Sequence, residues 1–265
     1  MDVILASGSP RRKGLLELAG IDARVLITNA DETGTGAPEF QVREFALRKL
    51  ECAIGMLADS SHTSGGEFTL PAILSAEKKI TFRRDLGLLP TENSRRTMED
   101  VFRREYNTSL DAGRVNSPPV ETFEDKLLDL PPYVIIAADT LVYIEGKILA
   151  KPATSQEAFD MLKMLEGAKH TVYTGVAMAK SAGAYLETYV FASSTDVFFR
   201  SLTDDEIHAY IKTGEPFDKA GAYGVQEKGA LLVEKVVGDF YTVVGLPLAR
   251  VCKVLSEMGV DVWKV

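Results

Sequence analysis

Hydrophobic and polar positions near the start of the chain predict a strand, a helix and a second strand. Apolar residues run over 3–6, an amphipathic pattern follows over 11–19, and a second apolar run occupies 23–28. Ser9 is a favourable N-cap residue and Pro10 a favoured first helical residue, so the start of the helix is well specified. The chain therefore opens with a β-α-β unit.

A longer amphipathic helix is expected over 39–56. Apolar residues recur on one face of this segment, and charged residues, among them Lys49, cover the other face. The apolar stripe consists of Phe40, Phe45, Leu47, Leu50 and Ile54.

The periodicity weakens between residues 59 and 132, where the chain contains the polar stretches SSHTSGGE, TENSRR and RVNSPPVE. We interpret this part as an inserted, partly disordered segment within a single domain that spans 1–265. One short helix is expected inside it, because apolar residues fall on one helical face at Met98, Val101, Phe102 and Tyr106.

Regular patterns return after residue 132 and indicate an α/β sheet with both parallel and antiparallel pairs. An apolar strand over 133–138 is followed by an Asp-Thr interruption, a short strand and a Glu-Gly-Lys turn. Helices are expected over 155–165, capped by Thr154 or Ser155, over TDDEIHAYIKTG with Thr203 as N-cap and Gly214 beyond its end, and over 247–258. The remaining strands are predicted at HTVYTGVAMAK, AYLETYVFASS, TDVFFRSL, ALLVEKVVGD, YTVVGL and VDVWKV.

Composition restricts the class of protein and the kind of partner. With 46% hydrophobic and 26% charged residues, the chain has the composition of a soluble globular protein. A net charge of −8 argues against a nucleic-acid polymer as partner and favours phosphate binding confined to a cleft. Cys52 and Cys252 make neither a disulfide framework nor a zinc site, and no apolar run has membrane-spanning length. We therefore expect a cytoplasmic protein without a signal peptide or a membrane partner.

Two arginines stand in the first turn of the first predicted helix, where the helix dipole disfavours cations by up to about 1 kcal/mol. Arg11 and Arg12 follow the hydroxyl residues Ser7 and Ser9, and free backbone N–H groups are expected at the same helix start. Such a set of donors suits a phosphate chain. The alternative is a solvated basic turn that pairs with surface carboxylates.

A carboxylate, Asp139, ends a run of residues that appears in the pattern as a buried strand. Isolated carboxylates are rarely placed there without a partner or a task, although a strand-end aspartate that caps a turn is the alternative. The following hairpin would bring Lys151 back towards it, unless Lys151 is an exposed strand-end residue. Asp31 and Glu32 follow the second strand and would face the arginines across a cleft, or form a plain ion pair.

A Gly-rich loop contains the third candidate cluster, Asp218 and Lys219 followed by Gln226. Glycines allow close approach of a ligand to the backbone, and the Gln amide can donate and accept towards a base edge.

The histidines His62, His170 and His208 have no metal-ligand or triad spacing, and we treat them as incidental. Arginines and lysines for a polyphosphate, carboxylates for a divalent cation and one carboxylate for water together predict phosphoanhydride hydrolysis. No P-loop motif is present.

Three long stretches resemble the Maf family of nucleoside triphosphate pyrophosphatases: LASGSPRRKGLLELAG, AADTLV with GKILAKP, and TGEPFDKAGAYGVQEKGALLVEKVVGDFYTVVGLPL. The resemblance covers everything except the insertion of roughly 70 residues. It implies a mixed elongated sheet flanked by helices, an inosine-triphosphatase-like (Maf/Ham) fold with a cleft between two lobes. It also implies a frequent homodimer and hydrolysis of a nucleoside triphosphate to monophosphate and pyrophosphate with a divalent metal, Mg²⁺ or Mn²⁺.

The resemblance assigns roles to individual residues. Asp139 matches the general base, and the phosphate and metal residues match at Arg12, Glu32, Lys49 and Lys151. Glu32 and Asp139 are the expected metal ligands, and Ser7, Ser9, Asp218 and Lys219 complete the expected substrate contacts. Specificity positions typical of the dTTP and UTP branch are occupied by Arg11, Thr140 and Gln226.

The sequence thus predicts an enzyme that removes excess or non-canonical pyrimidine triphosphates. A 7-methyl-GTP pyrophosphatase is the nearer alternative, although that branch differs at the three specificity positions. A non-catalytic nucleotide-binding regulator of cell division is the other, and it would not need the acids Glu32 and Asp139, which this chain keeps. The insertion could cover the cleft, extend a dimer face or project into solvent.

Overall fold

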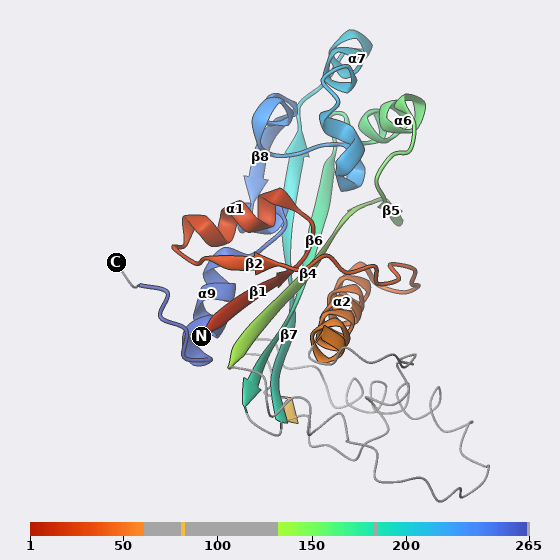
Figure 1. The fold of residues 1–265 in the computed structure, drawn as a ribbon. Helices are drawn as coiled ribbons and strands as arrows, with labels where there is room; N and C mark the ends of the chain where they lie inside the picture. The colour runs from red at the N-terminus through yellow and green to blue at the C-terminus, as the bar shows by residue number, and fades with distance from the viewer. Residues whose placement is uncertain (61–80, 83–131, 183–184, 264–265) are drawn as a thin grey trace, which may run out of the picture.

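The computed structural model describes residues 1–60, 81–82, 132–182 and 185–263. These residues form one elongated mixed sheet with helices against both faces (Figure 1). The strands of the described part are β1 (Asp2–Ala6), β2 (Ala23–Val25), β3 (Thr81–Phe82), β4 (Tyr133–Ile144), β5 (Lys147–Leu149), β6 (Lys169–Ala182), β7 (Tyr185–Phe199) and β8 (Val233–Val237). Their order is β2-β1-β4-β6-β7-β3, with β5 paired to β4 and β8 to β7.

Helices flank this sheet in two layers and at one end. They are α1 (Pro10–Leu18), α2 (Pro38–Ser60), α6 (Ser155–Leu165), α7 (Asp204–Ile211), α8 (Phe240–Val244) and α9 (Leu248–Glu257), with 3-10 turns η1 (Glu215–Asp218), η2 (Ala220–Ala222) and η3 (Glu227–Leu232). None of the helices in the described residues is long and apolar enough to cross a membrane. The mixed α/β architecture predicted from the sequence is confirmed.

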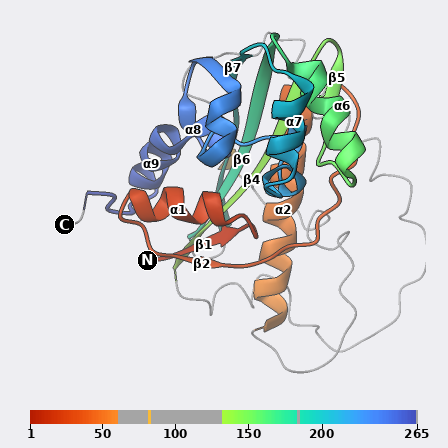
Figure 2. The same ribbon diagram turned by 90° about the horizontal axis from the view of Figure 1, so that it is seen from above.

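Alternation of side chains along β4 distributes the core between the two faces of the sheet, because successive residues of a strand point to opposite sides. Ile135 and Ala137 pack with buried residues of α2 on one face. Val134, Ile136 and Ala138 pack with α1 and α9 on the other. Figure 2 shows α2 on one side of β4 and β6 and the α1, α8 and α9 helices on the other side. A third cluster of buried residues joins α6 and α7 to the far ends of β4, β6 and β7.

Parallel pairing of β1 with β2 and with β4 confirms the predicted β-α-β opening. The predicted N-caps are also present: Ser9, Thr154 and Thr203 each accept a hydrogen bond from a backbone N–H of the first turn. The Glu206 carboxylate in turn accepts a hydrogen bond from the backbone N–H of Thr203, which completes a capping box.

Some predicted strands differ from the structure. The segment YTVVGL is not a strand, since 240–244 form the short helix α8. Asp239 caps this helix by accepting from the backbone N–H of Tyr241, and Gly245 ends it at φ 120°. This local capping outweighs the strand preference of the β-branched residues. Asp139 and Thr140 do not interrupt the apolar strand, because β4 continues through them.

The two strands expected on either side of residue 195 are one continuous strand, β7. The described residues of the predicted final strand, 260–263, are not in a strand. Within the predicted insertion, α2 includes residues 59 and 60, and β3 pairs in parallel with β7. The helix expected around 98–106 lies outside the described residues, and the single-domain interpretation with an insertion over 59–132 stays a prediction.

One edge of β4 has a gap in its strand pairing, and the candidate site lies at this gap. The pairing of β1 with β4 ends at Ala137, whereas the pairing of β5 with β4 begins at Val142. On its other edge β4 is paired with β6 through the whole interval. Among the described strands, residues 138–141 therefore pair with β6 only, and a ligand can approach their other edge.

Candidate active site

A cavity of about 880 Å³ opens at this gap in β4. Its walls come from the β1–α1 turn, the loop before α2, β4, the β5–α6 connection and the Gly-rich loop. All twelve residues that the sequence predicts for the site line the cavity: Ser7, Ser9, Arg11, Arg12, Glu32, Lys49, Asp139, Thr140, Lys151, Asp218, Lys219 and Gln226. The structure thus brings together candidates that are widely separated in the sequence.

Lys49 connects two carboxylates at one end of the cavity. Its Nζ atom lies 2.5 Å from Oδ1 of Asp139 and 2.6 Å from Oε1 of Glu32. Lys49 and Asp139 are buried, whereas about half of the Glu32 side chain is exposed. Lys49 is therefore buried, although it lies on the charged face of its helix.

A glycine that the sequence analysis did not single out makes this contact possible. Gly175 lies opposite Asp139 in the β4–β6 ladder, and a Cβ atom there would lie 2.1 Å from the carbonyl oxygen of Val42. The α2 backbone therefore packs directly on β6, which places Lys49 two turns further along the helix beside Asp139. A glycine inside a predicted strand was the signal that marked this close approach.

Burial and charge act in opposite directions on the two carboxylates. Burial raises the pKa of Asp139 above its ordinary value, although the charges of Lys49 and Arg12 oppose the rise. Burial also acts to raise the pKa of Glu32, but the hydrogen bond and charge of Lys49, followed by Lys151 and Arg12, lower it overall. The site therefore separates a more readily protonated carboxyl group from a more strongly ionised one.

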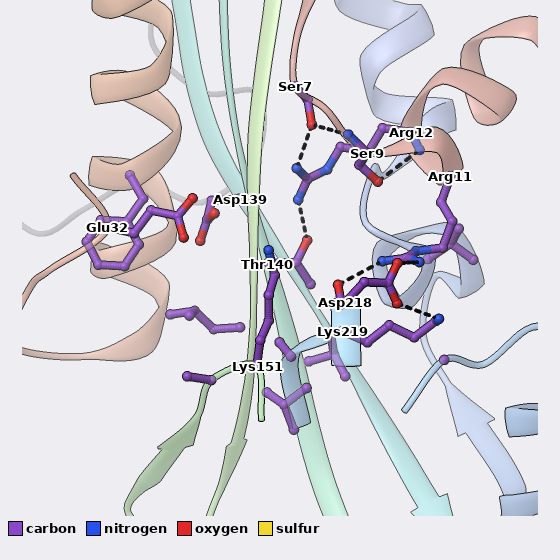
Figure 3. A pocket seen from close by; sticks show the side chains of 18 of the residues that line it. Ser7, Ser9, Arg11, Arg12, Glu32, Asp139, Thr140, Lys151, Asp218 and Lys219 are labelled. Carbon is purple, nitrogen blue, oxygen red and sulfur yellow. Dashed lines mark hydrogen bonds and ion pairs between the residues drawn. The ribbon is translucent and has the colours of Figure 1, made fainter. Parts of the chain in front are cut away.

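Arg12 is buried and lies on the other side of β4 (Figure 3), where three groups accept hydrogen bonds from its guanidinium. Its Nε atom donates to the carbonyl oxygen of Gly245 at 2.8 Å. One terminal nitrogen donates to Ser7 Oγ at 3.1 Å and the other to Thr140 Oγ1 at 3.0 Å. A guanidinium carries five N–H donors, so two remain for a ligand.

Arg11 points away from Arg12 towards the Gly-rich loop. It donates to Oδ2 of Asp218 at 2.7 Å, and Lys219 binds the other oxygen of the same carboxylate at 2.7 Å. Lys219 also donates to the carbonyl oxygen of Glu215. Asp218 lies between two cations at the wall of the cavity, and Figure 3 shows this cluster on the side of β4 opposite to Glu32 and Asp139.

The Gly-rich loop contains the three turns η1, η2 and η3, and residues 223–226 join η2 to η3 without regular structure. Gly221 adopts φ 68°, and a Cβ atom there would meet Val142 at 2.9 Å. A Cβ atom on Gly224 would meet the Lys219 side chain at 2.8 Å. These glycines allow the loop to pack against β4 and Lys219 along the cavity, as expected from their conformational freedom.

Of the predicted residues Lys151 and Asp31, Lys151 lines the cavity and Asp31 does not. Lys151 lines the cavity, and its charge acts on Glu32, although its side chain remains exposed. Asp31 instead accepts from Thr33 and pairs with Arg48, so it does not face the two arginines of the first helix.

The carboxylates of Glu32 and Asp139 are two groups of the cavity that could contact a divalent cation. An ammonium bridges Glu32 and Asp139, so the two carboxylate oxygens converge on one point where positive charge is favourable. Mg²⁺ prefers oxygen ligands and is often held by one or two carboxylates together with substrate phosphates and water. Among the described residues no group of three or more His, Cys, Asp or Glu side chains could hold a metal ion. Glu32 and Asp139 alone could supply only part of the coordination of such an ion, so substrate and water oxygens would have to supply the rest.

Two histidines lie within the described part of the chain. His208 stacks on Phe159 outside the cavity lining, and His62 lies outside the described residues. His170 is buried, and its Nε2 atom lies 2.6 Å from the hydroxyl group of the cavity residue Tyr223. Burial lowers the pKa of His170 to about 4, so this ring is neutral at physiological pH.

The arrangement places cationic side chains and two carboxylates in one cavity on an α/β sheet, and comparison with known proteins identifies the family. The family model of Maf-like proteins matches residues 90–258. A dTTP/UTP pyrophosphatase of Bacillus thuringiensis subsp. konkukian (strain 97-27) is 32% identical over 262 residues, which cover 98% of this chain and 97% of the relative. A dTTP/UTP pyrophosphatase of Bacillus cereus (strain AH187) has the same identity and coverage. The chain belongs to the Maf family.

Proposed function

We propose that this protein is a nucleoside triphosphate pyrophosphatase that hydrolyses dTTP and UTP to the monophosphate and pyrophosphate. The observation that carries the proposal is the buried Asp139 carboxylate beside Lys49 in a cavity rich in cationic side chains. Membership of the Maf family and the names of the Bacillus relatives support the same activity.

Asp139 acts as the general base. Its carboxylate accepts a proton from water as the water oxygen attacks the α-phosphorus of the nucleotide. The bond from the α-phosphorus to the bridging oxygen breaks, and the electron pair leaves with pyrophosphate. The raised pKa of Asp139 suits this role, because a base is most effective when its pKa approaches the working pH.

Cations around the cavity neutralise the triphosphate. Arg12 keeps two N–H donors for phosphate oxygens, and Lys151 and Lys219 line the same space. Lys49 exchanges its contact with the carboxylates for a phosphate oxygen when the nucleotide binds. The site concentrates positive charge in a protein whose net charge is −8, which favours a small anionic substrate over a nucleic acid.

A Mg²⁺ or Mn²⁺ ion would be held by Glu32 and Asp139 together with phosphate oxygens. When bound, such an ion neutralises charge on the leaving pyrophosphate. The protein's own contribution is to keep Glu32 ionised through the nearby cations and to hold Asp139 at the same point. These two carboxylates are the proposed metal ligands.

Base selection is assigned to Arg11, Thr140 and Gln226, which all line the cavity. Their hydrogen-bonding groups suit the polar edge of a pyrimidine, and modified pyrimidine triphosphates are included among the proposed substrates. We also propose a cytoplasmic homodimer, which size-exclusion chromatography with light scattering would test.

One assay tests the activity. The protein is incubated with each nucleoside triphosphate, including 7-methyl-GTP, in the presence of Mg²⁺ or Mn²⁺, and monophosphate and pyrophosphate are measured. We expect dTTP and UTP to be hydrolysed, and Asp139→Asn to lower kcat by at least about 100-fold. The matched control, Asp160→Asn, changes an exposed α6 carboxylate outside the cavity and should retain activity. Full activity of Asp139→Asn would exclude the proposed mechanism.

A further inference from the structure

A directional chain of hydrogen bonds runs from Arg12 into the sheet behind the cavity. Thr174 lies on β6 opposite Thr140 of β4 and is fully buried. Its Oγ1 atom lies 2.9 Å from Oγ1 of Thr140 and donates to the carbonyl oxygen of Thr242 in α8 at 2.8 Å. Thr174 does not line the cavity, and neither composition nor motif spacing points to it.

The direction of each bond follows from the chemistry of the groups. A carbonyl oxygen can only accept, so the single hydroxyl proton of Thr174 is committed to Thr242. The hydroxyl group of Thr140 must then donate its own proton to Thr174. Arg12 can only donate, and it occupies one acceptor position on Thr140. Thr140 is therefore left with one free lone pair and no free proton.

This assignment matters because Thr140 is partly exposed at the cavity wall, one residue from Asp139. Arg11, on the same side of β4 in Figure 3, carries donors only. The protein therefore presents a donor and an acceptor as a pair. Uracil and thymine offer the complementary pair, the O4 acceptor and the N3–H donor, whereas cytosine offers the reverse, an N4 amino donor and an N3 acceptor.

We infer that Thr174 is a positioning residue for base selection: it fixes the Thr140 hydroxyl as an acceptor for N3–H, while Arg11 donates to O4. This inference rests on the proposed function. Sites built to bind a polar group of the substrate reject analogues that leave that site group unpaired, so an acceptor fixed in this way excludes cytosine. Guanine offers the same pair as uracil, so this hydroxyl separates UTP from CTP and not from GTP.

The test compares kcat/KM for UTP and CTP in wild-type protein, Thr174→Val and Thr174→Ser. Valine removes the acceptor, so the Thr140 proton can turn towards the cavity and donate to N3 of cytosine. We expect the UTP-to-CTP ratio to fall by about tenfold or more in Thr174→Val. Thr174→Ser keeps the hydroxyl group and should restore the wild-type ratio. The dTTP-to-UTP ratio should remain unchanged in all three proteins, since both bases present the same edge.

Each outcome has a distinct meaning. Parallel loss of UTP and CTP hydrolysis in Thr174→Val, with an unchanged ratio, would overturn the inference and assign Thr174 a purely structural role. Absence of dTTP and UTP hydrolysis in the wild-type protein would instead overturn the proposed function. If Thr174→Val does not fold, Thr174→Ala removes the same acceptor with a smaller side chain and gives the same comparison against Thr174→Ser.

Discussion

The Nζ atom of Lys49 lies 2.5 Å from Oδ1 of Asp139, although the two residues are 90 positions apart in the chain. Both side chains are buried, so each charge offsets the desolvation of the other. Because Glu32 binds the same ammonium, Lys49 also separates two like charges that would otherwise repel each other. The pair therefore controls how readily the proposed base is protonated.

Replacement of Lys49 by methionine should move the acidic limb of the pH–rate profile to higher pH. Burial already raises the pKa of Asp139, and Lys49 is the largest influence that opposes this rise. Without the ammonium the pKa of Asp139 increases further, so the ionised base is present only at higher pH. We also expect kcat/KM at neutral pH to fall by about 100-fold, as measured by pyrophosphate release across a range of pH.

The matched control is Lys169→Met. Lys169 forms an exposed ion pair with Asp196 outside the cavity lining, so its loss should leave the profile in place. An acidic limb that is the same in Lys49→Met and in wild-type protein would contradict the assignment of Asp139 as the titrating base.

Most of the candidate site could be predicted from the sequence because its residues interrupt regular patterns. A carboxylate at the end of an apolar run and two cations at a helix N-terminus are local contradictions that single out Asp139, Arg11 and Arg12. Thr174 violates no local rule, since threonine is common in strands. Gly175 is a glycine inside a strand pattern, which marks a close backbone approach without showing what approaches. Their importance depends on what packs behind them, which only the three-dimensional structure shows.

The fold was predictable to a similar extent and for a similar reason. Segments with clear periodicity and good caps were predicted well: α6 has the predicted ends, and α7 begins after the predicted cap Thr203 but ends at Ile211, before the predicted end. Errors fell on short apolar segments, where strand and helix patterns are alike. In α8 the N-cap Asp239 and the following Gly245 were the signals of a helical turn, and they were outweighed by the β-branched residues between them.

Substitution of Gly175 by alanine should both destabilise the protein and lower activity. A Cβ atom at this position would lie 2.1 Å from the Val42 carbonyl oxygen, so α2 has to move away from β6. We expect a loss of about 2 kcal/mol or more in the free energy of unfolding, measured by urea denaturation. Because Lys49 moves with α2, kcat/KM should fall as well, even at temperatures where the variant is folded.

Gly55→Ala, on the α2 helix that packs against Gly175, provides the control. Among the described residues, no atom lies within 4 Å of a Cβ atom placed at Gly55, so alanine there should be neutral or stabilise by up to about 1 kcal/mol. Equal stability of Gly175→Ala and wild-type protein would show that the close approach of α2 to β6 is not maintained in solution.

Glu32→Gln should raise the Mg²⁺ concentration needed for half-maximal activity. Glu32 and Asp139 converge on Lys49, and a neutral amide at residue 32 removes one of the two negative charges proposed to hold the ion. A tenfold increase or more, at about 1.4 kcal/mol per factor of ten, is expected in a Mg²⁺ titration at saturating UTP. Glu39→Gln, on the exposed ion pair with Arg43, is the control. An unchanged Mg²⁺ requirement in Glu32→Gln would remove Glu32 from the metal site.

His170→Gln should reduce the dependence of stability on pH between about 6.5 and 4. Burial lowers the pKa of His170 to about 4, so the unfolded chain takes up a proton in this range while the folded protein does not. The free energy of unfolding therefore decreases as the pH falls, by roughly 3 kcal/mol over the whole window for this one group. Urea denaturation at pH 7 and pH 4.5 measures the difference, which should be smaller in the variant whatever its stability at pH 7.

Two comparisons isolate the histidine from the other titrating groups in this experiment. Carboxylates also contribute to the acid dependence: hydrogen bonds from Arg200 and Thr203 lower the pKa of Glu206 to about 2, and this contribution is the same in both proteins. His208→Gln replaces an exposed histidine of α7 and should keep the wild-type dependence. If His170→Gln and His208→Gln lose stability equally between pH 7 and 4.5, the ring beside Tyr223 is not held neutral by burial. Its contact with the cavity wall would then depend on pH in the same range.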